Sequence, residues 1–66
     1  HMDEYDVVQF VQRIIRERRI QVLEVLENKG VKSMEQYQHL MGELDAINHL
    51  NQELSDMLER QETLDV

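Results

Sequence analysis

The chain has 66 residues, with no cysteine, no proline, no tryptophan and only two glycines. Without cysteine it cannot use disulfides or cysteine-based zinc sites, which commonly support chains too short to bury a large core. No apolar run exceeds two residues, whereas a membrane span needs about 20. We therefore expect one domain over residues 1–66, located in the cytoplasm, with no membrane segment and no secretory leader.

Residues that favour helices (Glu, Gln, Leu, Arg and Met) dominate the sequence, so helix is the first expectation. The one strong interruption lies at residues 28–33, where Gly30 suits the left-handed position after a helix end. Ser33 and Gln36 have the spacing of a capping box that begins a second helix. These signals predict an all-α antiparallel two-helix hairpin, with helices at about 4–29 and 34–62 and a turn at 30–33.

Each predicted helix carries an apolar stripe at alternating spacings of three and four residues, with one polar residue, Arg18 or Asn51, inside it. Further apolar residues widen the stripes beyond the narrow seam that two helices need. These flanking residues are Val7, Phe10, Ile14, Leu23, Leu26, Met41, Leu50 and Met57.

A lone hairpin with such wide stripes would expose much apolar surface to water. We therefore predict that two hairpins associate into a four-helix-bundle homodimer. The predicted self-association residues are Val8, Val11, Ile15, Arg18, Val22, Leu40, Leu44, Ile47, Asn51, Leu54 and Leu58.

Three residues in these helices each allow two interpretations. Arg18 either extends its charged head to solvent or pairs with Glu43 or Asp45, which the hairpin register places nearby. Asn51 either fixes the register from a buried position or lies at the edge of the interface. Gly42 either permits a close helix approach or is simply tolerated, at about 1 kcal/mol relative to alanine.

Charge is distributed unevenly along the chain, whose formal net charge is −7. Four arginines lie between residues 13 and 19, whereas residues 30–66 contain eight acids and two bases. The negative balance argues against direct nucleic-acid binding, and the nearby acids argue against a basic membrane-surface helix. The acidic second helix is instead suited to a basic surface on a larger protein partner.

The sequence offers little catalytic chemistry. Asp45, His49 and Glu53 form an i, i+4, i+8 ridge, but it lies opposite the apolar stripe and lacks the Glu-x-x-His spacing of di-iron bundles. We interpret the ridge as a solvated helix surface, with a metal site as the less favoured alternative. Ser33 acts as a cap, and Ser55 has no nearby histidine in the sequence. We predict no enzyme activity, no metal ligands and no cofactor.

The second half of the chain combines Tyr37, Leu40-Met41-Gly42, Ala46-Ile47 and a tail through Glu53-Leu54 and Leu58. This pattern resembles short uncharacterised helical proteins of tailed bacteriophages. The resemblance implies a small virion or assembly component, or a factor acting on the host, in the host cytoplasm or the virion. We predict a non-enzymatic protein that binds its own copies and a larger partner. The alternative is an acidic phage regulator or inhibitor that binds a basic surface of a host protein.

Overall fold

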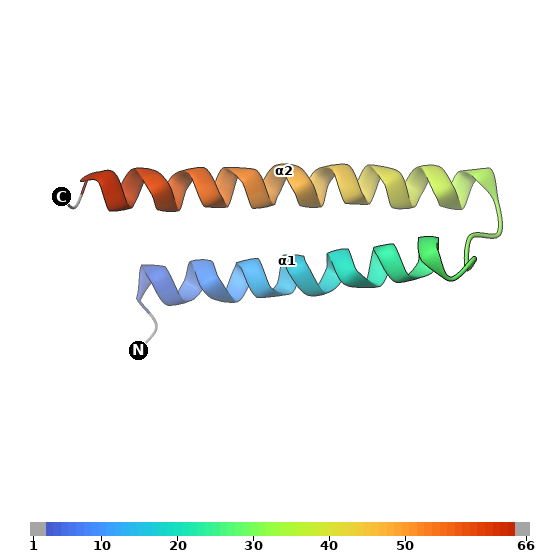
Figure 1. Ribbon diagram of the computed structural model, residues 1–66, viewed down its shortest axis with the longest axis horizontal. Helices are drawn as coiled ribbons and strands as arrows, with labels where there is room; N and C mark the ends of the chain where they lie inside the picture. Colours follow the sequence, from blue (N-terminus) through green and yellow to red (C-terminus); the bar gives the residue numbers. More distant parts are fainter. Residues whose placement is uncertain (1–2, 65–66) are drawn as a thin grey trace.

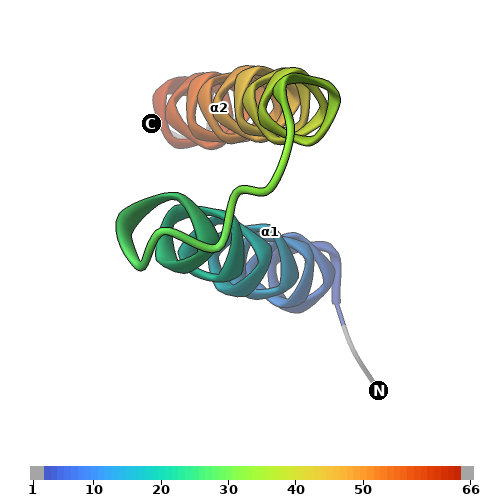
Figure 2. The same ribbon diagram turned by 90° about the vertical axis from the view of Figure 1, so that its right-hand side faces the viewer.

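The computed structural model describes residues 3–64, with side chains for residues 3–60, and contains two antiparallel helices (Figure 1). Helix α1 spans Glu4–Glu27 and helix α2 spans Met34–Leu64. The predicted all-α hairpin is thus confirmed, whereas the four-helix bundle remains a prediction. The hairpin is a slab of 49 × 22 × 15 Å, and the end-on view shows one layer of two helices with both broad sides uncovered (Figure 2).

Helix α1 begins with a complete N-cap. The Asp3 side chain accepts a hydrogen bond of 2.8 Å from the backbone N–H of Asp6. Glu4 and Asp6 place negative charge in the first turn, where it interacts favourably with the positive end of the helix dipole. These acids explain why the predicted start of the helix agrees with the observed one.

Helix α1 ends at Glu27, two residues before the predicted end, and this shifts the left-handed residue from Gly30 to Lys29. Lys29 has φ 59°, whereas neither glycine has a positive φ. The N–H of Gly30 donates to the carbonyl of Val25 at 2.9 Å, as the second residue past the cap does in a Schellman motif. Gly30 is needed for space instead, because a Cβ there would lie 3.2 Å from both Val25 Cγ1 and the Val25 carbonyl oxygen.

Helix α2 begins at the predicted cap residue, although only half of the predicted capping box forms. The backbone N–H of Gln36 donates to Ser33 Oγ at 3.0 Å, as expected. The side chain of Gln36 reaches one residue further back than a capping box requires, and its Oε1 accepts from the N–H of Lys32 at 2.6 Å. The turn is therefore fixed from both of its ends.

The small core lies between the helices in the segment of residues 15–47, which we call the turn-proximal half. Val22, Leu40 and Ile47 are 1%, 7% and 6% exposed. Figure 1 shows the two helices closer together near the turn than at the ends of the chain. Five partly buried side chains pack against this core: Ile15, Val25, Leu26, Val31 and Leu44.

The seam between the helices follows the predicted positions on α2, and on α1 it departs from them at two of five positions. On α2 every predicted seam residue from Leu40 to Leu58 is buried or half-buried. On α1 the half-buried positions include Gln12 and Arg19, whereas the predicted Val11 and Arg18 lie one residue away on the exposed side. The apolar pattern favoured Val11 over Gln12 for the seam. In the structure α1 is rotated about its axis so that polar Gln12 and Arg19 face α2 instead.

Gly42 lies inside α2 with open space around it. No atom lies within 4 Å of the position that a Cβ would occupy there. Within this hairpin the interpretation of Gly42 as a point of close helix approach is therefore wrong.

Candidate self-association surface

Arg18 and Glu43 form the main polar link between the helices. Arg18 Nε donates to Glu43 Oε1 at 2.6 Å, and Arg18 Nη2 donates to Glu43 Oε2 at 3.0 Å. The two side chains are 48% and 27% exposed. Of the two interpretations of Arg18, the structure combines parts of both: its head extends to the exposed edge of the seam and pairs there with Glu43, and no interior ion pair forms. Arg18 is also held within its own helix, because its Nη1 donates to Gln21 Oε1 at 3.1 Å.

The pair alters the acidity of both partners. Hydrogen bonds from Arg18 lower the pKa of Glu43; partial desolvation opposes this, and attraction to Arg18 and His39 adds to it. The same hydrogen bonds and attraction raise the pKa of Arg18, so it stays charged. His39 Nε2 lies 4.0 Å from Glu43 Oε2 and is the other basic group beside this carboxylate. Glu43 is therefore ionised at neutral pH and fixed in position.

The exposed apolar residues of α1 that flank the seam form a row of their own. Val7, Val11 and Ile14 are all exposed, and each lies one residue before a seam position. Their spacings of four and three place them on one face of the helix, and Arg18 continues the row four residues later. This row is therefore apolar toward the start of α1 and charged beyond it.

A matching row runs along α2. Glu43, Leu50 and Met57 are separated by seven residues each, so they also share a face. Leu50 is 49% exposed, whereas Met57 is half-buried. Because Arg18 and Glu43 are hydrogen-bonded to each other, both rows lie on the same broad side of the slab. We call this side the Val11 face; it consists of Val7, Val11, Ile14, Arg18, Glu43, Leu50 and Met57.

The opposite broad side carries both apolar and polar residues. Met34 and Met41 are 67% and 37% exposed, and their row, at spacings of seven, continues through Asn48 and Ser55. A shallow groove there, which we call the Arg16 groove, is crossed by a hydrogen bond of 3.2 Å from Arg19 Nε to Asn48 Oδ1. Two arginines contribute to its lining, but no acid and no large apolar side chain does. The lining residues are Gln12, Arg16, Arg19, Asn48, Asn51 and Ser55.

The predicted self-association residues divide into two groups. Val22, Leu40 and Ile47 are buried in the hairpin seam, and Val8, Ile15, Leu44, Asn51, Leu54 and Leu58 are half-buried along it. Only Val11 and Arg18 lie exposed on a broad side. The role of these residues between chains stays a prediction, since most of them already lie in the seam between α1 and α2 of the same chain. Val7, Ile14 and Leu50 were predicted only as flanking residues, although their spacing from Val11 would have placed them on this face.

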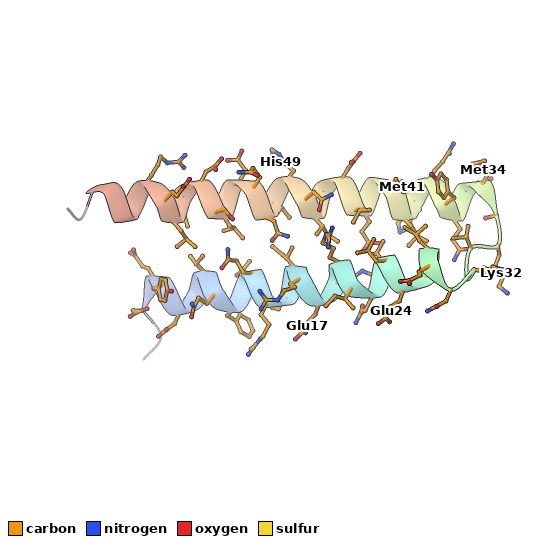
Figure 3. The ribbon with its side chains drawn as sticks, in the orientation of Figure 1. Glu17, Glu24, Lys32, Met34, Met41 and His49 are labelled. Carbon is orange, nitrogen blue, oxygen red and sulfur yellow. The ribbon has the colours of Figure 1, made fainter. Side chains whose placement is uncertain are left out.

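Charged and polar side chains point outward from both helices. Glu17 and Glu24 point away from α2, and His49 points away from α1 (Figure 3). The ridge that contains His49 thus lies opposite the seam, as the sequence predicted. Among residues 3–60 no group of three or more histidine or acidic side chains is placed to hold a metal ion. Over the described residues, neither helix combines the length and the hydropathy needed to cross a membrane.

Comparison of the chain with protein-family models, curated proteins and solved structures finds no match. The resemblance to phage proteins therefore stays a prediction.

Proposed function

We propose that this chain is a non-enzymatic interaction protein that self-associates, most simply as a dimer forming a four-helix bundle, and also binds a larger protein. The observation that carries the proposal is the imbalance between core and surface. Three side chains are buried, whereas ten large apolar side chains among the described residues are exposed. Apolar surface in such quantity marks an interaction site in a soluble protein.

The resemblance of the second half to short phage proteins supports a structural or assembly role. A rigid rod that buries little of its own apolar surface gains stability when copies associate, because association removes that surface from water. Such a protein is expected to co-purify with a capsid or tail component.

The test of self-association is the mass of the chain in solution. Sedimentation equilibrium and light scattering, run from low to high micromolar concentration, should show a mass of twice the single chain that dissociates on dilution. A mass that stays at the monomer value throughout this range would overturn the proposal.

An acidic regulator is the second candidate, and the outward side of α2 favours it. Asp45, His49 and Glu53 are exposed there, and Glu35 adds negative charge near the start of the helix. An acidic strip of this kind suits a basic surface on a host protein. Charge-neutral variants of Asp45 and Glu53 should then release a host protein that the natural chain captures, and capture by the natural chain should weaken steeply with added salt.

A further inference from the structure

We infer that the Val11 face is the dimer interface and that the partner copy lies on it with both turns at the same end of the bundle. In this arrangement the twofold axis runs parallel to the helices, so that α1 of each chain lies over α2 of the other. The inference rests on the proposed self-association and adds which face is used and in which orientation.

The register within the hairpin defines what each residue would meet across the interface. Arg18 and Glu43 lie at one level, since they are hydrogen-bonded. Val11 lies seven residues before Arg18 and Leu50 seven residues after Glu43, so in antiparallel helices these two also share a level. A twofold axis parallel to the helices keeps every level unchanged. Arg18 then lies opposite the partner's Glu43, and Val11 lies opposite the partner's Leu50.

Charge complementarity favours this orientation. Each end of the Arg18–Glu43 pair meets the opposite sign in the partner, which gives two arginines and two carboxylates in alternation. With the turns at opposite ends, a centred dimer would instead lay apolar Val11 and Leu50 over the charged pair of the partner. Only when both turns lie at the same end do apolar residues meet apolar residues while charged residues meet charges of the opposite sign.

The groove on the other broad side offers a second copy no charge complementarity. The Arg16 groove carries two arginines without an acid in its lining, so two copies meeting there would bring like charges together. The slab measures 49 Å by 22 Å across its broad sides. Covering one of them with an equal slab is enough for the about 800 Å² per partner that a specific interface buries.

The orientation can be tested with cysteines, because the chain has none of its own. Val11→Cys and Leu50→Cys chains are prepared separately, mixed in equal amounts, equilibrated and oxidised mildly. We expect the mixed disulfide between the two variants to exceed its statistical share over the like pairs. A mixed disulfide at or below its statistical share would contradict the same-end orientation, and cross-linking no greater than for an Ile20→Cys control would show that another face is used. Each result would overturn the inference.

The face can be tested by exchange of charge. Arg18→Glu and Glu43→Arg chains should each dimerise about tenfold or more weakly than the natural chain, because both place like charges across the interface. An equimolar mixture should recover dimers, since every cross-chain contact is then again of opposite sign. Mixing cannot repair a pair within one chain, so failure of the mixture to recover would overturn the inference. If the natural chain itself is monomeric, the proposed function fails, and the face and orientation fail with it.

Discussion

The two halves of the hairpin use their apolar residues differently. The turn-proximal half, residues 15–47, contains all three buried side chains and every residue packed against them. The terminal half, residues 4–14 and 48–64, has no buried side chain among those described, although six of its large apolar residues are exposed. One half therefore packs against itself, whereas the other presents four of its six exposed apolar side chains on the Val11 face, namely Val7, Val11, Ile14 and Leu50.

This difference follows from which residues fall in the seam. In the terminal half the seam contains Gln12 and, across from it, Asn51, and Val11 and Leu50 lie one residue to the side. In the turn-proximal half Val22, Leu40 and Ile47 form the buried core of the seam, and Arg19 is its polar member. The exposed apolar residues of the terminal half can be buried only by contact with another chain, so the stability of this half is expected to depend on protein concentration.

The largest effect should come from breaking the core of the turn-proximal half. Ile47→Ala removes a side chain that is 6% exposed, and we expect a loss of about 2–5 kcal/mol in the free energy of unfolding. Ile20→Ala, on the outward side of α1, is the control and should change stability by no more than about 0.5 kcal/mol. Urea unfolding followed by circular dichroism measures both, and equal losses would contradict the assignment of the core.

The next prediction concerns the terminal half and uses two isoleucines of equal exposure. Ile14 and Ile20 are both 49% exposed on α1, but only Ile14 belongs to the Val11 face. Ile20 follows Glu17 by three residues and precedes Glu24 by four, and these two acids point away from α2 (Figure 3). Ile14→Asp should weaken self-association at least tenfold, because it places a charge in the apolar part of the interface. Ile20→Asp should leave the association constant within about twofold. Sedimentation equilibrium decides between them, and equal loss in both would exclude this face.

The sequence was sufficient to predict the elements and one side of the seam. Cap residues and Gly30 indicated both helices, and the α2 stripe from Leu40 to Leu58, with Asn51 as its polar member, lies in the seam. In α1 the predicted Val8, Ile15 and Val22 lie in the seam, whereas Gln12 and Arg19 replace Val11 and Arg18. Rotation of a helix in its seam depends on packing and on hydrogen bonds from the other helix, such as those that join Arg18 to Glu43, and a periodic pattern alone cannot specify it.

The position of the left-handed residue was wrong for a related reason. A Schellman motif places it one residue after the cap, so its position depends on where the helix ends. Lys29 occupies it because Asn28 is the cap. The hairpin register, by contrast, placed Arg18 near both Glu43 and Asp45, since a short turn leaves little freedom in which residues face each other, but it did not distinguish between the two acids.

A smaller effect should come from the two glycines, which also differ in their surroundings. Gly42→Ala should raise the free energy of unfolding by about 0.5–1 kcal/mol, because the added Cβ has open space and alanine favours helix. Gly30→Ala should lower stability, since its Cβ would be pressed against the carbonyl and side chain of Val25 in the packed turn. Thermal unfolding of the two variants at one concentration measures the contrast, and stabilisation by both would show that the turn is looser than described.

The smallest effect should come from protonation of Glu43, at the boundary between the two halves. The pKa of Glu43 is lower in the folded chain than in the unfolded chain, so its ionised form stabilises the fold. This stabilisation is complete above the ordinary glutamate pKa of about 4.3. It is lost as pH falls through the lower pKa of the folded chain. Glu43→Gln lacks the ionised form at every pH. The melting temperatures of the natural chain and this variant should therefore differ near pH 6 and converge at acid pH. Glu17→Gln, on the outward side of α1, is the control, and a difference that persists undiminished in acid would show that the contact acts through packing and not through charge.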